Sequence, residues 1–493
     1  MTLTTLVLSV AITALAFTLI AGLGMRKVDN YLVSYLQFFT GVLFIFSGWV
    51  KAIDPLGTAY KMEQYFAEFE STFEGTWMSF LAPMFPALSE YSIGFSVFMI
   101  VLEIVLGVML LVGFWRRFAA WTFFLIVAFF TFLTGFTYLT GYVPEGVNFF
   151  EFGKWGPYVS TNMKVTDCGC FGDFLKLEPK VSFIKDLVLL VPAILFLFTW
   201  KNMHQLFSPA ARYSAVILSG IALTAYCFNN YAWNLPHTDF RPFKVGVNVG
   251  EQKNLEEEAV ANVEITAYKL RNIETGEEQL LAYDEYLKQY KNFPKEEWEA
   301  EQIKTEPAIP TTKISDFSAS DENGEDATEE LLFAEGYSLM FVAYKLYGTE
   351  GSKLEVKTDT IYALDTIPSV DTLLVEKKIV DFKKRQVTVA TYDWDDKYLG
   401  PWKAAAAPLM NKAAQDGHKA YAITAYADPD KITAFKQAIE VDAPFYVADD
   451  ILLKTIVRSN PGLVLLKDGE IKAKFHHRNM PTYEELKANY MQD

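Results

Sequence analysis

The chain has 493 residues, of which 51% are apolar and 15% aromatic, and its formal net charge is −16. This length exceeds one domain, and the apolar content is high for a soluble protein. The negative charge argues against a nucleic-acid-binding protein. Residues 1–230 carry 13 Lys and Arg and 14 Asp and Glu, a net of −1, which leaves −15 for residues 231–493. The composition therefore predicts a membrane-embedded front half followed by an acidic, water-exposed half.

Six apolar runs in the front half are long enough to cross a bilayer, which takes about 20 residues as helix. They are Leu3–Leu23, Leu32–Val50, Ile93–Phe114, Ala119–Thr140, Val181–Trp200 and Tyr213–Asn230. No basic residue precedes the first run and no small-residue cleavage site clearly follows it, so we expect an uncleaved anchor rather than a signal peptide. The sequence thus predicts an α-helical membrane bundle of about six helices.

Basic residues are densest in three short connections between these runs. They are Arg26 with Lys27, Arg116 with Arg117, and Lys201 with Arg212. Cytoplasmic loops carry an excess of Lys and Arg, so these connections are expected in the cytoplasm. The N-terminus, the two longer loops (52–92 and 141–180) and the tail are then expected outside, in the periplasm if the membrane is a bacterial inner membrane.

Two of the three cysteines stand one residue apart in the segment VTDCGCFGDF, residues 165–174. Cys168 and Cys170 flank Gly169, whose backbone freedom suits the small ring that a disulfide between them would close. Such a ring strains the disulfide and makes it oxidising, so we predict a catalytic redox pair outside the cytoplasm. A chance spacing and a static disulfide that braces the loop are the alternatives.

The other candidate site residues lie within or beside the apolar runs. Glu103 falls near the middle of the third run, where a carboxylate is costly unless it is paired, protonated or exposed to a water-filled cavity. Lys51 ends the second run, where catalysis and snorkelling are both open. Lys185 either contributes to the site or pairs locally with Asp186. Cys227, near the outer end of the sixth run, is either a resolving thiol or a packed side chain.

Cofactors are less well indicated by the sequence. No metal site is expected, because zinc takes four sulfur or imidazole ligands and the five histidines lie far from the cysteine pair in sequence. A quinone is a candidate, and aromatic residues of the outer loops would line its site, although aromatic belts are ordinary at membrane interfaces. These aromatic residues are Trp77, Phe149, Phe150 and Trp155.

The tail reads as an acidic segment followed by an α/β domain. Residues 251–335 are acidic and contain the turn-prone run DFSASDENGEDATEE, which favours an exposed connector or edge region. Strands are then expected at 337–345, 386–392, 418–425 and 444–448, and helices at 402–415, 429–440 and 451–457. A hairpin is expected to turn at Asp468-Gly469, and Thr482 with Glu485 forms a capping box for a last helix.

The membrane half resembles two related families. The segment DCGCFGD in an outer loop is similar to the family of the methylamine-utilisation protein MauE. The segments FIFSGWVKAIDPLGTAY (44–60) and EIVLGVMLLVGFWRRFAA (103–120) are similar to the DoxX family. The resemblance covers roughly residues 32–200 and implies a four-helix core engaged in thiol–disulfide or quinone-linked redox work.

The tail resembles a thioredoxin fold over about residues 313–493. The segment SNPGLVLLKDGEI (459–471) is similar to that fold's proline and the two antiparallel strands after it, with Pro461 in the place of the cis-proline. The stretch 346–385 looks inserted. No cysteine follows Cys227, so the CxxC dithiol of a thioredoxin is absent. The resemblance therefore implies a partner-binding module rather than an enzyme.

These observations predict five segments: a first anchor (1–31), a DoxX/MauE-like core with the CGC loop (32–200), a sixth membrane helix (201–230), an acidic connector (231–312) and a thioredoxin-like domain (313–493). The favoured function is a membrane redox component of an envelope complex, whose tail binds an extracytoplasmic protein partner. The alternative is a non-catalytic anchor or assembly subunit, with the cysteines as a brace. Membrane transport has Glu103 in its favour but lacks visible inverted repeats.

Overall fold

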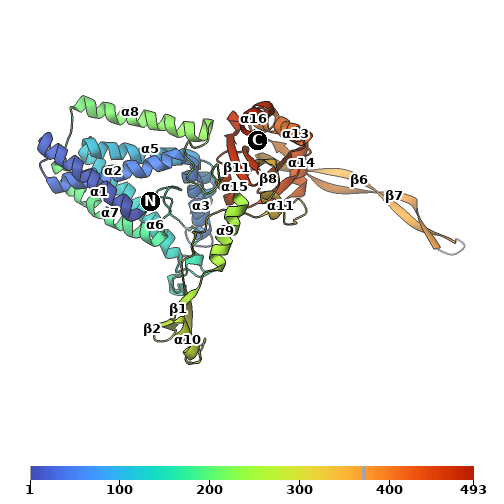
Figure 1. Ribbon diagram of the computed structural model, residues 1–493, viewed down its shortest axis with the longest axis horizontal. Coiled ribbons are helices and arrows are strands. Elements are labelled where there is room, and N and C mark those ends of the chain that lie inside the picture. Colours follow the sequence, from blue (N-terminus) through green and yellow to red (C-terminus); the bar gives the residue numbers. More distant parts are fainter. Residues whose placement is uncertain (1, 166, 369–372, 493) are drawn as a thin grey trace. The chain divides into compact units, whose positions relative to one another are not determined.

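The computed structural model describes residues 2–165, 167–368 and 373–492, and the side chains of 363–378 fall outside that description. The chain divides into two compact units, Met1–Arg241 and Pro242–Asp493. The first unit is helical and the second contains the β-sheets (Figure 1).

Six helices of the first unit have the length and apolar composition needed to cross a membrane. They are α1 (Leu3–Leu19, continued by a π-helical turn to Gly24), α2 (Tyr31–Ile53), α5 (Ser92–Val112), α6 (Arg116–Thr140), α7 (Pro179–Thr199) and α8 (Pro209–Phe228). Each overlaps one predicted run, so the prediction of a six-helix membrane bundle is confirmed. If all six cross the bilayer, the segments after α2, after α6 and after α8 share one side.

Helices α2 and α5 approach closely because glycines stand where they meet. A Cβ atom at Gly41 would lie 3.0 Å from the carbonyl oxygen of Gly107, and one at Gly107 would lie 2.8 Å from that of Gly41. Small residues allow such close backbone approach in membranes, where packing rather than water exclusion holds helices together. This contact brings facing side chains of α2 and α5 within reach of each other.

The segment between α2 and α5, predicted as a loop, contains a 19-residue helix that sequence reasoning missed. This helix, α3 (Pro55–Phe73), begins with Asp54 as N-cap, whose Oδ1 accepts a hydrogen bond from the Gly57 N–H at 3.1 Å. Proline in the first turn is favourable because its missing N–H is not needed there. A short helix, α4 (Met84–Ser89), precedes α5. The loop between α6 and α7 contains 3₁₀ turns at Phe152–Lys154 and Ser160–Asn162 and an isolated bridge between Phe171 and Leu175.

The main sheet of the second unit has six strands in the order β11-β10-β5-β8-β9-β4. The strands are β4 (Ala319–Ser320), β5 (Tyr337–Ala343), β8 (Lys419–Thr424), β9 (Phe445–Ala448), β10 (Gly462–Lys467) and β11 (Glu470–His476). Strands β5, β8 and β9 are parallel, and β10 runs antiparallel to both β5 and β11. The sheet is therefore mixed, as expected for a soluble α/β domain.

Helices connect these strands and bury the core. They are α11 (Thr328–Leu332), α12 (Asp396–Pro401), α13 (Ala407–Gln415), α14 (Pro429–Ile439), α15 (Asp450–Ile456) and α16 (Tyr483–Tyr490). Trp402 and Phe435 are buried against Phe341 of the sheet. The capping box of Thr482 and Glu485 forms as predicted, and the Asn460–Pro461 peptide is cis.

Two parts of the second unit differ from the expected connector and strands. After α9 (Val249–Ala261), the acidic segment folds into a three-stranded sheet with α10 (Tyr283–Gln289) beside it. Its strands are β1 (Ile265–Asn272), β2 (Glu278–Ala282) and β3 (Trp298–Lys304), in the order β2-β1-β3. The stretch that looked inserted forms a long hairpin, β6 (Gly348–Pro368) and β7 (Leu373–Trp394), which extends away from the main sheet (Figure 1).

The glycine contact between α2 and α5 gives a stability test. We expect Gly107→Leu to destabilise the full-length protein by about 1–3 kcal/mol, because the added side chain would overlap the Gly41 backbone. Gly94 of the same helix has open space around it and serves as the matched control. The thermal unfolding midpoint of the purified protein should fall for Gly107→Leu and not for Gly94→Leu; an equal fall in both would contradict the packing account.

Candidate functional site

The CGC segment forms a tight turn whose conformation requires glycine. Gly169 and Gly172 have φ values of +61° and +52°, and the Gly172 N–H donates to the Gly169 carbonyl at 3.1 Å. Glycine adopts these left-handed conformations without the steric cost that other residues pay. The two glycines thus determine the backbone path on which Cys168 and Cys170 stand.

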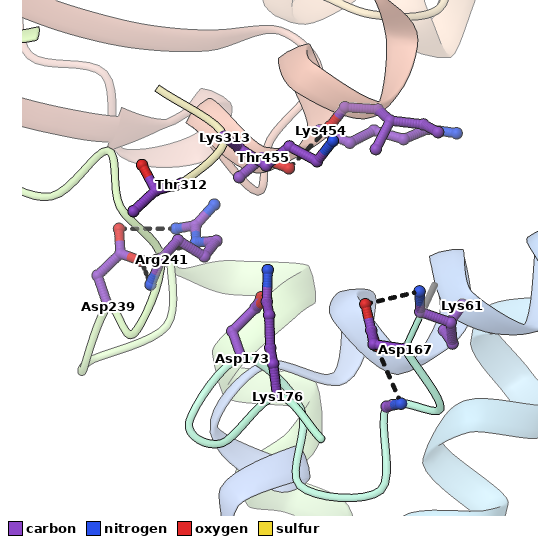
Figure 2. Close-up of polar contacts among 12 residues, drawn as sticks. Lys61, Asp167, Asp173, Lys176, Asp239, Arg241, Thr312, Lys313, Lys454 and Thr455 are labelled. Carbon is purple, nitrogen blue, oxygen red and sulfur yellow. Dashed lines mark hydrogen bonds and ion pairs between the residues drawn. The ribbon is translucent and has the colours of Figure 1, made fainter. Parts of the chain in front are cut away.

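Helix α3 contacts this turn through Asp167. Asp167 accepts two interactions at once: its Oδ1 bonds the Gly169 N–H at 3.1 Å, and its Oδ2 pairs with Lys61 Nζ at 3.2 Å (Figure 2). Both charged side chains are partly exposed, so the ion pair contributes little energy by itself. Its effect is positional, because it ties the cysteine turn to α3.

Helix α2 contacts the turn through the backbone of Cys170. Ser47 Oγ donates a hydrogen bond to the Cys170 carbonyl at 2.9 Å. Cys170 and Phe174 pack against the apolar core of the bundle, and the Phe174 ring lies 5.6 Å from that of Phe46. All three cysteines carry free thiols. The cysteine turn is therefore folded onto the end of the helical bundle.

Four charged side chains lie close to the turn; three of them are buried, and Lys185 is partly buried. Lys51 of α2 pairs with Glu103 of α5, and the two are only 6% and 4% exposed. Lys185 and Asp186 of α7 pair at 2.7 Å, and Asp186 also accepts from Thr134 Oγ1 at 3.0 Å. Paired and hydrogen-bonded charges are the form in which a membrane interior tolerates them. Lys51 therefore does not snorkel, and Lys185 pairs with Asp186 as one alternative predicted.

The two cysteines and the four charged side chains all line one cavity of about 440 Å³. Its polar lining comprises both cysteines, both ion pairs and hydroxyl groups that include Tyr65 and Thr134. The remaining wall is largely apolar and aromatic, and includes Leu43, Phe44, Met62, Phe66, Phe69, Phe85, Phe95, Phe129, Phe130 and Phe171. An apolar cavity with a few convergent polar groups is typical of a small-molecule site.

The environment keeps both thiols protonated at neutral pH. Burial, and to a lesser extent the neighbouring Cys170 sulfur, raises the pKa of Cys168 to about 12, although the Ser182 and Tyr65 hydroxyls oppose the shift. Burial also raises the pKa of Cys170, and the positive charges of Lys185 and Lys51 oppose that rise. The reduced pair is thus a neutral dithiol that needs a base or a counter-ion to react.

The structure brings together Cys168, Cys170, Glu103 and Lys51 among the predicted site residues. Cys227 does not join them. It is absent from the described residues that line the cavity, and it packs in a separate apolar cluster with Leu223.

The aromatic residues proposed from the outer loops also lie elsewhere. Trp77 is 82% exposed, and Phe149 packs against Phe150 and Trp155 rather than on the cavity. Within the described ranges, no group of three or more His, Cys, Asp or Glu side chains could hold a metal ion.

Sequence reasoning missed the contribution of α3. Lys61 and Tyr65 reach the cysteine turn and the cavity from this helix, and Tyr65 also bonds Thr137 at 3.1 Å. The signal was present in the Asp54-Pro55 pair, which is a helix N-cap followed by proline at the first helical position.

The fold and the cavity define a multi-pass membrane protein with a polar, cysteine-bearing site inside its helical bundle. Residues 29–144 match the family described as methylamine utilisation protein MauE, so the membrane part is MauE-like from α2 through α6. The cysteine turn lies beyond the matched residues. No curated protein and no solved structure matches the chain.

The raised thiol pKa predicts a pH profile. In a Cys170→Ser, Cys227→Ser variant, alkylation of Cys168 should be slow at pH 7 and rise about tenfold per pH unit without levelling near pH 9, because the thiolate stays scarce below a pKa of about 12. Quenched labelling with iodoacetamide and mass spectrometry would measure the rate. A plateau between pH 8 and 9 would contradict the burial account.

The buried pair of Lys51 and Glu103 predicts a pattern of stability changes. Lys51→Met should cost about 3–5 kcal/mol, because it leaves the Glu103 carboxylate buried without its partner. The double variant Lys51→Met, Glu103→Leu should recover much of that loss. Exposed Lys180 supplies the matched control, Lys180→Met, with little effect. Thermal unfolding of the full-length protein measures all three, and a double variant no more stable than Lys51→Met would contradict a coupled pair.

Proposed function

We propose that this protein is a thiol–disulfide redox component of an envelope membrane, with Cys168 and Cys170 as the cycling pair. The observation that carries the proposal is the cavity that both cysteines and two ion pairs line. A brace would need only a fixed position in the loop. Thiols that line a cavity beside buried charges instead have a space in which a reactant can approach them.

A quinone is the electron acceptor that this cavity suits. Its wall is mainly aromatic and aliphatic, as an apolar ring requires, and the Lys51 and Lys185 ammonium groups offer N–H donors to ring oxygens. Oxidation of the dithiol releases two electrons and two protons, which together convert a quinone to a quinol. This assignment agrees with the redox role implied by the DoxX-like and MauE-like segments.

The tail is proposed to be a thioredoxin-like domain that presents or selects a protein partner. The order β11-β10-β5-β8-β9, with parallel β5, β8 and β9 and an antiparallel hairpin, supports that assignment. The chain has no cysteine after Cys227, so thiol exchange would take place at the membrane turn. Under the basic-loop orientation, turn and tail both lie outside the cytoplasm, as in a bacterial inner membrane facing the periplasm.

The alternative function is a non-catalytic anchor whose tail docks onto a larger envelope complex. The observation in its favour is the β6–β7 hairpin, which exposes Leu354, Val356 and Phe382. An isolated two-stranded hairpin is marginal in water, so a partner surface would stabilise it. Under this alternative the cysteines are dispensable for activity.

Cysteine substitution separates these functions. Membranes containing the full-length protein should oxidise a reduced dithiol peptide when supplied with a soluble quinone. Cys168→Ser or Cys170→Ser should lower the rate about a hundredfold or more, because a single thiol cannot cycle to an internal disulfide. Cys227→Ser is the matched control and should retain activity. Full activity in either of the first two variants, at equal membrane abundance, would reject the redox function and favour the anchor.

A further inference from the structure

The two sulfurs of the cysteine turn face different surroundings. Around Cys168 lie the hydroxyls of Tyr65 and Ser182 and the carboxylate of Asp167. Asp167 and its partner Lys61 are partly exposed, whereas Tyr65 and Ser182 are buried. Both cysteines are partly buried, and Cys170 also packs against the apolar core of the bundle. Cys168 thus follows the partly exposed Asp167–Lys61 pair, whereas Cys170 packs against the helical bundle.

The charged groups that act on Cys170 come from three helices. They are Lys185 and Asp186 of α7, Lys51 of α2 and Glu103 of α5. Two ammonium groups and two carboxylates cancel, so this cluster is neutral while Cys170 is protonated. A thiolate at Cys170 would be an added negative charge, and Lys185 exerts the largest opposing effect among these groups.

Lys185 is placed to meet such a charge. Its Nζ lies 5.6 Å from the ring centroid of Phe171, the residue that follows Cys170, while it also pairs with Asp186 at 2.7 Å. Electrostatic attraction is strong in a dry interior, and a neighbouring cation favours the thiolate form of a cysteine. Lys51, which pairs with Glu103 across the α2–α5 contact, also acts on Cys170 but less strongly than Lys185.

We propose that the two cysteines have separate roles: Cys168 is the sulfur that exchanges with an external thiol, and Cys170 is the leaving sulfur whose thiolate Lys185 stabilises. The proposal rests on the redox function above and adds the direction of exchange. Lys185 is a positioning residue in this scheme, because it acts through Cys170.

The external dithiol is oxidised in two exchange steps. A thiolate of the external dithiol attacks Cys168 Sγ of the oxidised pair, the Cys168–Cys170 bond breaks, and its electron pair goes to Cys170 Sγ, which becomes the thiolate beside Lys185. The second thiolate of the external dithiol attacks its own mixed disulfide and releases Cys168 as a thiolate. Both cysteines then take up the protons that the external dithiol lost. The external dithiol is oxidised to a disulfide, and the cysteine pair is reduced.

Alkylation of single-cysteine variants tests the role of Lys185. With Cys168 and Cys227 replaced by Ser, Lys185→Met should move the rise of Cys170 alkylation with pH upward by about one unit, because the thiolate loses its counter-ion. With Cys170 and Cys227 replaced by Ser, the same substitution should leave the Cys168 profile unchanged. Lys185→Arg should preserve the Cys170 profile, and Lys180→Met on the exposed part of α7 is the matched control.

A variant that removes both charges of the Lys185–Asp186 pair distinguishes an effect on Cys170 from a folding defect. Lys185→Met leaves Asp186 buried without its ammonium partner, so Lys185→Met, Asp186→Leu removes both charges together. The Cys170 shift should persist in this double variant at normal membrane abundance. An unchanged Cys170 profile, or an equal shift at both cysteines, would overturn the assignment of Lys185.

The direction of exchange has its own test with an aromatic disulfide reagent such as dithiobis-nitrobenzoate. In full-length protein lacking Cys227, the Cys170→Ser variant should form the mixed disulfide about ten times faster than Cys168→Ser, because Cys168 adjoins the partly exposed Asp167–Lys61 pair while Cys170 packs against the bundle core. Faster reaction of Cys168→Ser would overturn the assigned roles. A wild-type pair that never cycles would defeat the redox function itself, whereas the alkylation profiles still decide whether Lys185 acts on Cys170.

Discussion

The site depends on the ion pair between Lys51 and Glu103. A charged side chain within a membrane helix costs about 2.5–3.5 kcal/mol on insertion scales, so neither residue is tolerable there without a partner. They can meet because Gly41 and Gly107 let α2 and α5 approach closely. The pair has two roles, because it links α2 to α5 and its two charged groups also line the cavity.

The cysteine turn is held by contacts from two helices that follow each other in the chain. Ser47 of α2 bonds the backbone of Cys170, and Lys61 of α3 pairs with Asp167. The turn's glycines fix the spacing of the sulfurs, and these outer contacts fix its position on the bundle. As a result, Cys168 lies beside Asp167 while Cys170 borders the charged cluster, although only one residue separates them.

Much of this arrangement could be predicted from the sequence, because the relevant signals are local. Bilayer-length apolar runs predicted the six helices, the CGC spacing drew attention to the cysteine segment, and Glu103 was expected to be paired, protonated or exposed to a water-filled cavity. The identity of its partner could not be derived, since Lys51 lies 52 positions away and meets Glu103 only through helix packing. Lys51 could equally have reached the interface by snorkelling.

Other features were missed for different physical reasons. Helix α3 is only moderately apolar, so a search for bilayer-spanning runs passed over it despite its Asp54-Pro55 start. The acidic stretch after α9 was expected to be a connector because its net charge is high, yet Tyr268, Tyr286 and Trp298 give its small sheet aromatic contacts. Phe149, Phe150 and Trp155 of the outer loop pack on one another and on helix residues away from the cavity, whereas the aromatic residues that line the cavity come mainly from the helices.

The most direct test of the account is a redox titration of Cys168 and Cys170 in native membranes. Differential alkylation and mass spectrometry across a series of applied potentials would give the fraction of the pair present as a disulfide. The account predicts a pair that converts reversibly between dithiol and disulfide at an oxidising potential. A pair that stays disulfide-bonded at all but strongly reducing potentials, or stays reduced throughout, would contradict it and leave the turn a structural element.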